Sequence, residues 1–247
     1  MSGSELTPEL KEQQAELKQI VESHDHIVFF GGAGVSTESG IPDFRSSNGI
    51  FTTSGLKNPE EIVSHSFFMA HPAEFYDFYR KTMVPADAKP NAAHLKLAQL
   101  EREGKLDAVI TQNIDGLHQK AGSKNVFELH GTVSRNYCMD CGAEYSTDFI
   151  MATDGVPKCT KCGGIVRPAV VMYEEALDPD VIEGSISAIS KAEVLIVAGT
   201  SMVVYPAAGF IDYFRGDKLV IINKSPTPRD RDADLLIAGP VGQIMDW

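Results

Sequence analysis

The residues in this sequence best suited to chemistry are its four cysteines, which all lie in one short stretch. Their spacing is C-x2-C-x17-C-x2-C, and a glycine follows the second cysteine of each pair. This pattern predicts a zinc site rather than disulfides or a redox dithiol, and four thiolates leave no open position for water. We therefore expect one structural zinc ion bound by Cys138, Cys141, Cys159 and Cys162.

Small, polar or titratable residues follow five short apolar runs. The runs have the length of buried strands: Ile27–Phe30, Ala108–Thr111, Val126–Leu129, Val194–Ala198 and Leu219–Ile222. The residues after them are Gly32, Ala33, Gly34, Ser36 and Thr37, then Gln112, Asn113, Ile114 and Asp115, then His130, then Gly199, Thr200 and Ser201, and finally Asn223 and Lys224. Open α/β sheets bind ligands at the carboxyl ends of their strands, so five such ends predict one assembled site.

Helix-like segments separate several of these runs. One begins near Asn91 and stops at Gly104, another spans about Pro179–Ser190, and Thr7-Pro8-Glu9 has the signature of a helix start. Strands that alternate with helices indicate parallel pairing with right-handed crossovers. The fold class is therefore α/β, with a Rossmann-like parallel sheet and helices on both of its faces.

Two stretches interrupt the alternation and predict a smaller domain. Phe44–Met83 is rich in aromatic residues and suits a helical insert or lid, and about 134–167 holds the cysteines in a zinc ribbon. We expect one catalytic core over 1–247, with a large domain of about 1–43, 84–133 and 168–247. The small domain then consists of a helical insert, about 44–83, and the zinc ribbon.

The glycine-rich turn after the first run resembles a dinucleotide-binding loop only in part. Gly32 and Gly34 match its first two glycines, and such glycines let the backbone approach a pyrophosphate at a helix N-terminus. Thr37 stands where the third glycine belongs, and no acidic residue ends a second strand about twenty residues later. These differences argue against a hydride-transfer dehydrogenase. The alternative interpretation of the glycine loop is an ordinary tight turn between a strand and a helix.

Three residues are candidates for proton transfer and catalysis. An imidazole such as that of His130 can act as a base near neutral pH, although a lone histidine is more often structural. Asn113 and Asp115 are two residues apart, so an Asx turn or a helix cap is their alternative role. The sequence has neither a Ser-His-Asp order nor an H-E-x-x-H motif, which leaves triad and metallohydrolase mechanisms without support.

Composition limits the class of partner. The 247 residues carry a formal net charge of -12, and a mean hydropathy of -0.11 is typical of a soluble globular protein. That charge argues against direct nucleic-acid binding and is compatible with lysine-rich peptides, although acidic proteins are also common for solubility. No run is long enough to span a membrane, and Met1–Lys11 lacks the features of a secretory signal, so we expect a cytoplasmic protein without membrane contact.

Taken in order, these motifs resemble those of the sirtuins, which are NAD-dependent protein lysine deacylases. The resemblance covers about His24 to Ile244 and rests on the segments Gly32–Ser36 with Ser39–Arg45, Thr111–His118, Leu129–Gly131, the two cysteine pairs, Arg167–Glu175, and Gly199–Ser201 with Val203–Pro206. It implies an enzyme of the bacterial single-core type that consumes NAD, holds one structural zinc ion and acts on acetylated lysine in peptides and proteins.

The resemblance also implies roles for individual residues. Phe44, Arg45 and Val241 join the strand-end residues named above as NAD contacts, and His130, Asn113 and Asp115 become catalytic. Peptide and acyl-lysine would be bound by Phe44, Ile114, Val171, Met172, Tyr173, Glu175 and Val203. The peptide backbone would add as a strand between segments near Glu174-Glu175 and Met202-Val203.

The implied reaction transfers the acyl group to ADP-ribose. The amide oxygen of acyl-lysine attacks the ribose carbon that bears nicotinamide, and His130 activates a ribose hydroxyl that attacks the resulting imidate. The products are nicotinamide, free lysine and an acyl-ADP-ribose. An apolar tunnel would align the amide and exclude water.

The sequence departs from the family pattern in two places. Glu174 occupies a position where the family commonly has glycine, and it adds a charge that could favour basic residues in the peptide. Family members that prefer acidic acyl groups have a Tyr-x-x-Arg arrangement. Here the residue three positions after Tyr76 is Tyr79, and Arg80 comes one position later. Acetyl is therefore favoured over succinyl, with a desuccinylase or other deacylase and a protein ADP-ribosyltransferase as alternatives. A zinc-ribbon nucleic-acid binder is disfavoured by the charge.

Overall fold

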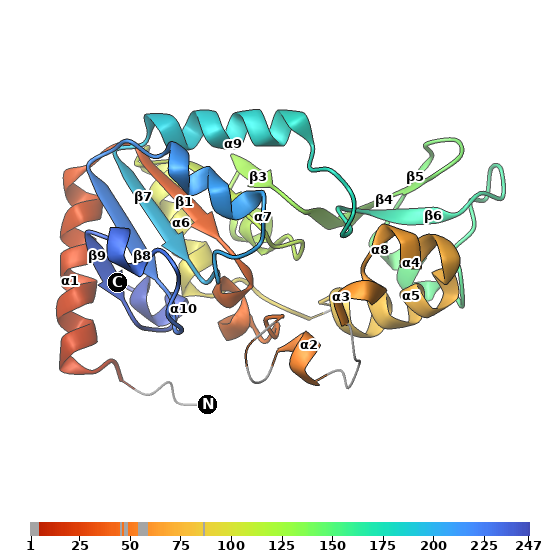
Figure 1. Ribbon diagram of the computed structural model, residues 1–247, viewed down its shortest axis with the longest axis horizontal. Helices are drawn as coiled ribbons and strands as arrows, with labels where there is room; N and C mark the ends of the chain where they lie inside the picture. The colour runs from red at the N-terminus through yellow and green to blue at the C-terminus, as the bar shows by residue number, and fades with distance from the viewer. Residues whose placement is uncertain (1–4, 45, 47–48, 54–58, 86) are drawn as a thin grey trace.

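The computed structural model places two β-sheets side by side along the long axis of the molecule (Figure 1). It describes residues 5–44, 46, 49–53, 59–85 and 87–247. The larger sheet has six strands and the smaller has three. The chain passes from the larger sheet into the smaller one and later returns, so the residues near these crossings lie between the two sheets.

The larger sheet is parallel throughout and has the strand order β3-β2-β1-β7-β8-β9. Its strands are β1 Ile27–Gly31, β2 Leu106–Thr111, β3 Val126–Glu128, β7 Val194–Ala198, β8 Lys218–Ile222 and β9 Leu235–Ile237. Every residue of β1 and β7 is buried, which is the pattern of a parallel sheet covered on both faces. The predicted α/β fold class is confirmed, and β9 is a strand that the sequence analysis did not predict.

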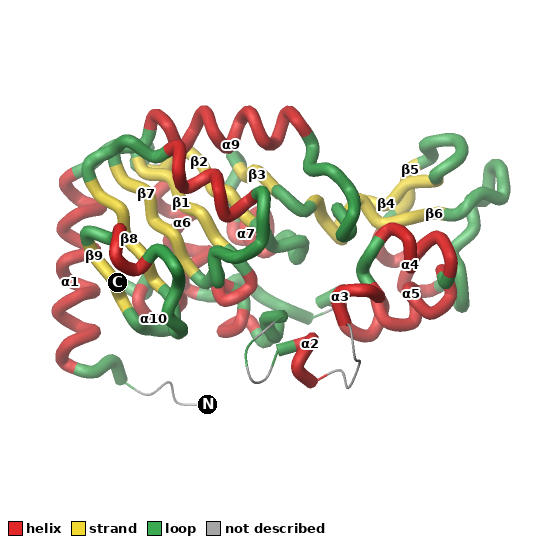
Figure 2. The backbone as a smooth tube through the Cα atoms, viewed as in Figure 1, coloured by secondary structure: helices red, strands yellow, loops and turns green. Residues whose placement is uncertain are grey.

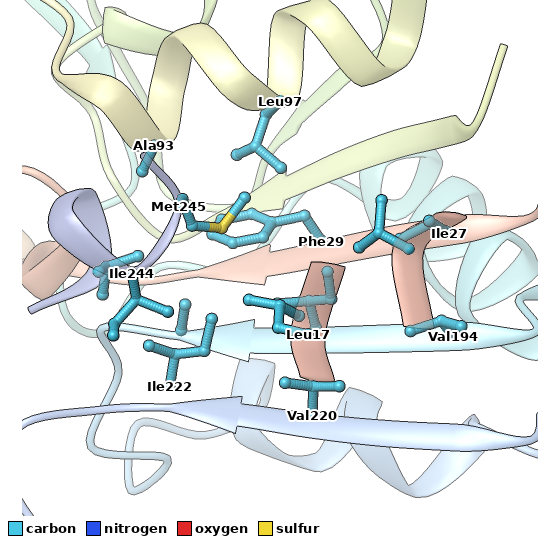
Figure 3. Packing of buried hydrophobic residues seen from close by; sticks show 14 of the residues in the cluster. Leu17, Ile27, Phe29, Ala93, Leu97, Val194, Val220, Ile222, Ile244 and Met245 are labelled. Carbon is cyan, nitrogen blue, oxygen red and sulfur yellow. The ribbon is translucent and has the colours of Figure 1, made fainter. Parts of the chain in front are cut away.

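Helices cover both faces of this sheet. The helices α1 Pro8–Ser23, α6 Ala92–Arg102 and α10 Val241–Ile244 pack on one face, and α9 Pro179–Lys191 and the 3-10 helix η4 Ala207–Tyr213 pack on the other. Figure 3 shows Leu17 of α1, Leu97 of α6 and Ile244 of α10 around Phe29 and Val220 of the sheet, and all five side chains are fully buried. Within the described residues no helix is long and apolar enough to cross a membrane.

Side-chain caps confirm the helix starts predicted at Thr7 and Asn91, and a third cap, at Asp178, was not predicted. The Thr7 hydroxyl accepts a hydrogen bond from Leu10 N at 3.3 Å, and the Asn91 side chain accepts one from Ala93 N at 3.0 Å. Asp178 caps α9 by accepting from Asp180 N at 2.9 Å. Such caps satisfy backbone donors that the first helical turn leaves unpaired.

The smaller sheet carries the cysteines. Its antiparallel strands have the order β5-β4-β6, formed by β5 Glu144–Tyr145, β4 Gly131–Cys138 and β6 Val166–Val170. The helix α8 Thr147–Ala152 follows β5, and Figure 2 shows long loops on either side of these strands. β4 starts directly after His130 and ends at Cys138, so one strand links the larger sheet to the metal-binding region.

The predicted helical insert is confirmed for the residues that the structure describes. It consists of α2 Ile50–Thr53, α3 Pro59–Ile62, α4 His65–Ala70, α5 Pro72–Phe78 and a turn of π-helix, η3 Tyr79–Met83. Phe68, Phe75, Tyr76 and Tyr79 are almost completely buried and form a cluster with the inner side chains of β4 and β6. The insert and the small sheet therefore share one hydrophobic core.

Candidate active site and metal centre

The four cysteine sulfur atoms lie within 4.8 Å of one another. The Sγ atoms of Cys138 and Cys162 are 3.4 Å apart, and those of Cys141 and Cys159 are 3.6 Å apart. A disulfide would require about 2.05 Å, whereas tetrahedral Zn–S bonds of about 2.3 Å imply separations of roughly 3.8 Å. The cluster therefore fits one zinc ion, and the predicted metal site is confirmed.

Two tight turns bring the cysteines together. Gly142 N donates to Cys138 O at 3.0 Å, and Gly163 N donates to Cys159 O at 2.9 Å. Both glycines have positive φ, 69° and 80°, a conformation that side chains with a Cβ rarely adopt. The glycine after each cysteine pair is thus required by the backbone of the turn.

Tyr145 adds a contact to one sulfur atom from outside the ligand set. Its hydroxyl donates to Cys159 Sγ at 3.1 Å and accepts from Thr160 N at 2.8 Å. A hydrogen bond to a metal ligand fixes the orientation of that ligand and tunes its donor strength. Tyr145 is not among the residues predicted for the site, because nothing in its spacing relates it to Cys159.

The glycine-rich turn after β1 packs against the turn after β7. Gly34 N donates to Gly199 O at 2.8 Å, and a Cβ on Gly34 would lie 2.7 Å from Gly199 Cα. A Cβ on Gly32 would similarly lie 2.8 Å from Gly199 O. These glycines are therefore needed for the close approach of two backbones. The expected helix at this turn is instead a pair of short 3-10 helices, η1 Ala33–Val35 and η2 Thr37–Ser39.

Ser36, Asn113 and Asp115 form a buried hydrogen-bonded cluster. Ser36 Oγ donates to Asp115 Oδ2 at 2.7 Å and accepts from Asn113 Nδ2 at 3.1 Å. Asp115 Oδ1 also accepts from Leu117 N at 2.9 Å, so Asp115 makes the Asx-type turn considered as its alternative role. The three side chains come from the ends of β1 and β2, and each is at most 8% exposed. Their orientation is consequently fixed by the fold.

His130 lies at the end of β3, between the two sheets. Its Nδ1 is 2.9 Å from the backbone oxygen of Gln112. Because a carbonyl oxygen can only accept, Nδ1 carries the proton of the neutral ring and Nε2 keeps its lone pair. Burial lowers the pKa of His130, and the Gln112 carbonyl opposes that shift. The ring is therefore neutral near pH 7 and can accept a proton at Nε2.

Thr200 connects the end of β7 to Gln112. Thr200 Oγ1 donates to Gln112 Oε1 at 2.8 Å and accepts from Met202 N at 3.2 Å. Gln112 Nε2 is buried and has no partner among the described residues. A buried amide donor without a partner is unfavourable, so this group is suited to a bound ligand with an oxygen acceptor.

A cavity of about 970 Å³ contains most of the predicted site. Its lining includes Ala33, Gly34, Ser36, Thr37, Phe44, Gln112, Asn113, Ile114, Asp115, His130, Val171, Met172, Tyr173, Glu175, Gly199, Thr200, Ser201, Asn223, Lys224 and Val241. This volume is at the upper end of the range for small-molecule sites. The ends of β1, β2, β3, β7 and β8 thus meet at one site, as predicted.

Two of the predicted site residues lie outside the cavity wall described above. Gly32 lies behind the wall, against Gly199 and Thr200. Val203 is 50% exposed beside the wall residue Val204. Arg45 lies outside the described residues.

Apart from Phe44, the residues of the helical insert that line the cavity were not predicted. Val63, Phe75, Tyr79, Thr82 and Met83 all line it. The aromatic run of the insert was visible in the sequence, but no periodicity shows which of its side chains face the cavity and which face the small sheet.

Glu175, predicted as a substrate contact, lines the cavity but is engaged within the protein. It forms an ion pair with Arg167, with Nη1–Oε1 and Nη2–Oε2 distances of 2.6 and 2.9 Å. Burial alone would raise the pKa of Glu175, but the hydrogen bonds from Arg167, Met172 N and His65 outweigh it and lower the pKa to about 2. The carboxylate is therefore ionised and held in place by the protein.

Comparison with known proteins agrees with this geometry. The family model described as the Sir2 family matches residues 32–206. An NAD-dependent protein deacetylase of Clostridium perfringens is 61% identical over 232 residues, which cover 93% of this chain and 95% of that protein. A protein of the same name from Cutibacterium acnes is 53% identical over 232 residues, with coverage of 93% and 95%.

Solved structures of Sir2 proteins have the same fold. One, described with a deacetylated p53 peptide and 3'-O-acetyl ADP ribose, superposes with a TM-score of 0.86 at 40% identity and covers 94% of this chain and 95% of that one. Another, described with a p53 peptide and NAD+, has a TM-score of 0.82 at 40% identity, with coverage of 93% and 94%. The chain therefore belongs to the Sir2 family, and the family predicted from its motifs is confirmed.

Proposed function

We propose that this sirtuin is an NAD-dependent protein lysine deacetylase, which transfers acetyl from acetyl-lysine to ADP-ribose and releases nicotinamide and O-acetyl-ADP-ribose. The observation that carries the proposal is the cavity of about 970 Å³ in which His130 lies with Ser36, Asn113 and Asp115. The cavity lies at the carboxyl edge of a parallel sheet and has room for both NAD and an acetyl-lysine side chain. The Sir2 structures described with peptide, NAD+ and acetylated ADP-ribose support the same choice of ligands.

His130 is the proposed general base. Bound NAD would supply a ribose carbon whose bond to nicotinamide breaks as the acetyl oxygen of acetyl-lysine attacks it. A ribose hydroxyl then attacks the acetyl carbon, lysine leaves as the free amine, and one water molecule completes O-acetyl-ADP-ribose. His130 Nε2 accepts the proton of that hydroxyl, while Nδ1 stays bonded to Gln112 O. The lowered pKa keeps the ring neutral and ready to accept a proton.

The residues around the turns after β1 and β7 are proposed to hold NAD. Ala33, Gly34, Thr37 and Phe44 are proposed contacts, together with Arg45, Gly199, Ser201, Asn223, Lys224 and Val241. The unpartnered Nε2 of Gln112 is a donor for a ligand oxygen. Ser36, Asn113 and Asp115 are proposed to shape the nicotinamide side, since their mutual hydrogen bonds fix their side chains. Gly32 supports this loop from behind.

Acetyl is the proposed acyl group. Arg80, one position beyond the place where an arginine would favour acidic acyl groups, donates to the backbone oxygens of Ile150 and Gly155. Tyr76 donates to the backbone oxygen of Val166. Both side chains are thus engaged with the small sheet region, and Val63, Phe75, Tyr79 and Met83 are the apolar or aromatic residues that this part of the chain contributes to the cavity wall.

We also infer the two-domain division. The hydrophobic cores support it, because one pair of clusters flanks the larger sheet while the insert and the small sheet share a third. The large domain then comprises about 1–43, 84–133 and 168–247, and the small domain about 44–83 and 134–167. A cytoplasmic location remains a prediction of the sequence.

One reaction tests the proposed activity. The protein is incubated with NAD and an acetyl-lysine peptide, and the products are followed by mass spectrometry. We expect the peptide to lose an acetyl mass while nicotinamide and O-acetyl-ADP-ribose appear in equal amounts. A peptide that instead gains ADP-ribose would replace the deacetylase with the ADP-ribosyltransferase alternative. A succinylated peptide of the same sequence serves as the control for acyl preference.

A further inference from the structure

Two segments at the cavity carry unusual backbone conformations. Glu174 has φ 75° and Met202 has φ 53°, and they are the non-glycine residues with positive φ among those described. This region is disfavoured for residues with a Cβ, and such conformations persist where surrounding contacts fix them. Glu174 lines the cavity, and so do Ser201, directly before Met202, and Val204, two positions after it.

The Glu174 side chain is held by the helical insert. Its Oε2 accepts from Ser66 N at 2.8 Å, and its Oε1 accepts from Ser66 Oγ at 2.9 Å. Both carboxylate oxygens therefore contact one residue in the first turn of α4. A charged acceptor makes stronger hydrogen bonds than a neutral one, so this contact is suited to offset the unfavourable φ.

The residues on either side of Glu174 pair with the same part of the insert. His65 N donates to Tyr173 O at 3.0 Å, and Tyr173 N donates to Val63 O at 3.1 Å. His65 Nδ1 lies 2.8 Å from Glu175 Oε1. Three consecutive residues, 173 to 175, are thus attached to residues 63–66, which are more than a hundred positions earlier in the chain.

This arrangement changes the role expected for Glu174. The sequence predicted a free charge that could favour basic residues in the peptide. In the structure the carboxylate is directed to α4, and its two oxygens already accept hydrogen bonds from Ser66. The side chain is therefore part of the contact between the loop and the insert.

We propose that Glu174 is a positioning residue that fixes residues 172–175 to the helical insert and so sets one edge of the peptide groove. The inference rests on the proposed function, because it takes this loop as the edge along which the substrate backbone lies. Glu174 then affects the binding of every peptide equally, whatever the charge of the residues that flank acetyl-lysine.

The kinetic test compares four variants with two peptides. The variants are Glu174→Gly, Glu174→Gln, Ser66→Ala and, as a matched control on the far side of the larger sheet, Glu12→Ala. The peptides differ only in having arginine or alanine on both sides of acetyl-lysine. Glycine tolerates the φ of this position, so Glu174→Gly removes the contact without straining the backbone.

For Glu174→Gly we expect KM for both peptides to rise by roughly three- to tenfold with kcat unchanged. Glu174→Gln retains one acceptor and should restore part of the affinity, Ser66→Ala should give a smaller rise for both peptides, and Glu12→Ala should have no effect. A rise confined to the arginine peptide would instead assign Glu174 to charge recognition and overturn the proposal. Unchanged KM values for both peptides in Glu174→Gly would overturn it as well.

A second measurement separates this proposal from the proposed activity. Hydrogen–deuterium exchange of the Ser66 amide requires no turnover. We expect this amide to exchange slowly in the wild type and faster in Glu174→Gly, because its acceptor has been removed. Equal exchange in the two proteins would contradict the contact itself, whereas wild-type protein without activity towards acetylated peptide would contradict only the proposed function.

Discussion

The metal centre and the proposed catalytic centre are assembled in different ways. The four sulfur atoms come from two tight turns that lie close together in the sequence and are joined by a small antiparallel sheet. In contrast, Ser36, Asn113, His130 and Thr200 follow β1, β2, β3 and β7, which are adjacent strands of the larger sheet. The first centre depends on local turn geometry, whereas the second depends on the strand order of the whole sheet.

β4 connects the two centres, because it begins after His130 and ends at Cys138. The shared core of the insert and the small sheet forms part of the cavity wall through Phe75 and Tyr79. Zinc is therefore expected to stabilise one wall of the cavity without taking part in the reaction.

Removal of zinc should have the largest effect. A structural zinc ion bound by four thiolates contributes folding free energy on the order of 10 kcal/mol in small zinc domains, so a strong chelator should unfold the small sheet and abolish turnover. Activity, zinc content and melting temperature measured on the same samples check this. Zinc added back should restore all three, and a metal-free protein with full activity would show that the wall does not depend on the ion.

Replacement of Ser36 by alanine should weaken the catalytic centre and leave the metal centre intact. It removes the donor to Asp115 and the acceptor for Asn113, and a buried group left unsatisfied costs about 1–3 kcal/mol. We expect kcat/KM to fall roughly tenfold with unchanged zinc content. Ser190→Ala, at an exposed position of α9, is the matched control. Equal activity in the two variants would remove Ser36 from the site.

Acid should destabilise the larger sheet through two buried histidines. Burial lowers the pKa of His94 to about 4, against an opposing effect of Asp115, and burial together with His94 lowers that of His118 to about 3. The unfolded chain protonates these side chains below pH 6.5, so stability is fully present above that pH and is lost as the pH falls towards the folded values. Each histidine contributes up to roughly 1.4 kcal/mol per pH unit.

Thermal unfolding between pH 7 and pH 4.5 measures this loss. His118→Met removes one of the two titrating groups and should flatten the decrease in melting temperature, whereas a substitution of the exposed His26 should not. A melting temperature independent of pH across this range would contradict the buried neutral histidines.

The smallest effect on turnover is expected for Tyr145→Phe. The variant loses the hydroxyl that donates to Cys159 Sγ, and such outer contacts typically change metal affinity by about tenfold or more. Zinc should transfer faster to a colorimetric chelator while the deacetylation rate of the zinc-loaded protein stays the same. Tyr213→Phe, on η4 of the larger domain, provides the control, and identical transfer rates would show that the hydroxyl does not influence the metal.

Local patterns in the sequence predicted the parts of the structure that depend on local interactions. The cysteine spacing identified the metal site, Asn91 identified the start of α6, and five apolar runs identified five of the six parallel strands. β9 was missed because Leu235–Ile237 is only three residues long, although Gly239-Pro240 marks a turn just after it.

The remaining errors involve residues that are distant in sequence. The contact of Glu174 with Ser66 spans 108 positions, and nothing in the spacing of either residue indicates it. Similarly, the aromatic run of the insert does not show that Phe75 and Tyr79 line the cavity while Tyr76 contacts the backbone of Val166. Such roles are set by how two elements pack against each other, which a single sequence does not reveal.

The most direct test of separate chemical and structural centres is the His130→Ala variant, with zinc content and turnover measured on the same preparation. A general base contributes about 10²–10⁴-fold to the rate, so formation of O-acetyl-ADP-ribose should fall by that factor. The variant should keep one zinc ion per chain and the melting temperature of the wild type. If His130→Ala turned over acetylated peptide at the normal rate, or lost its zinc together with its activity, the account would be wrong.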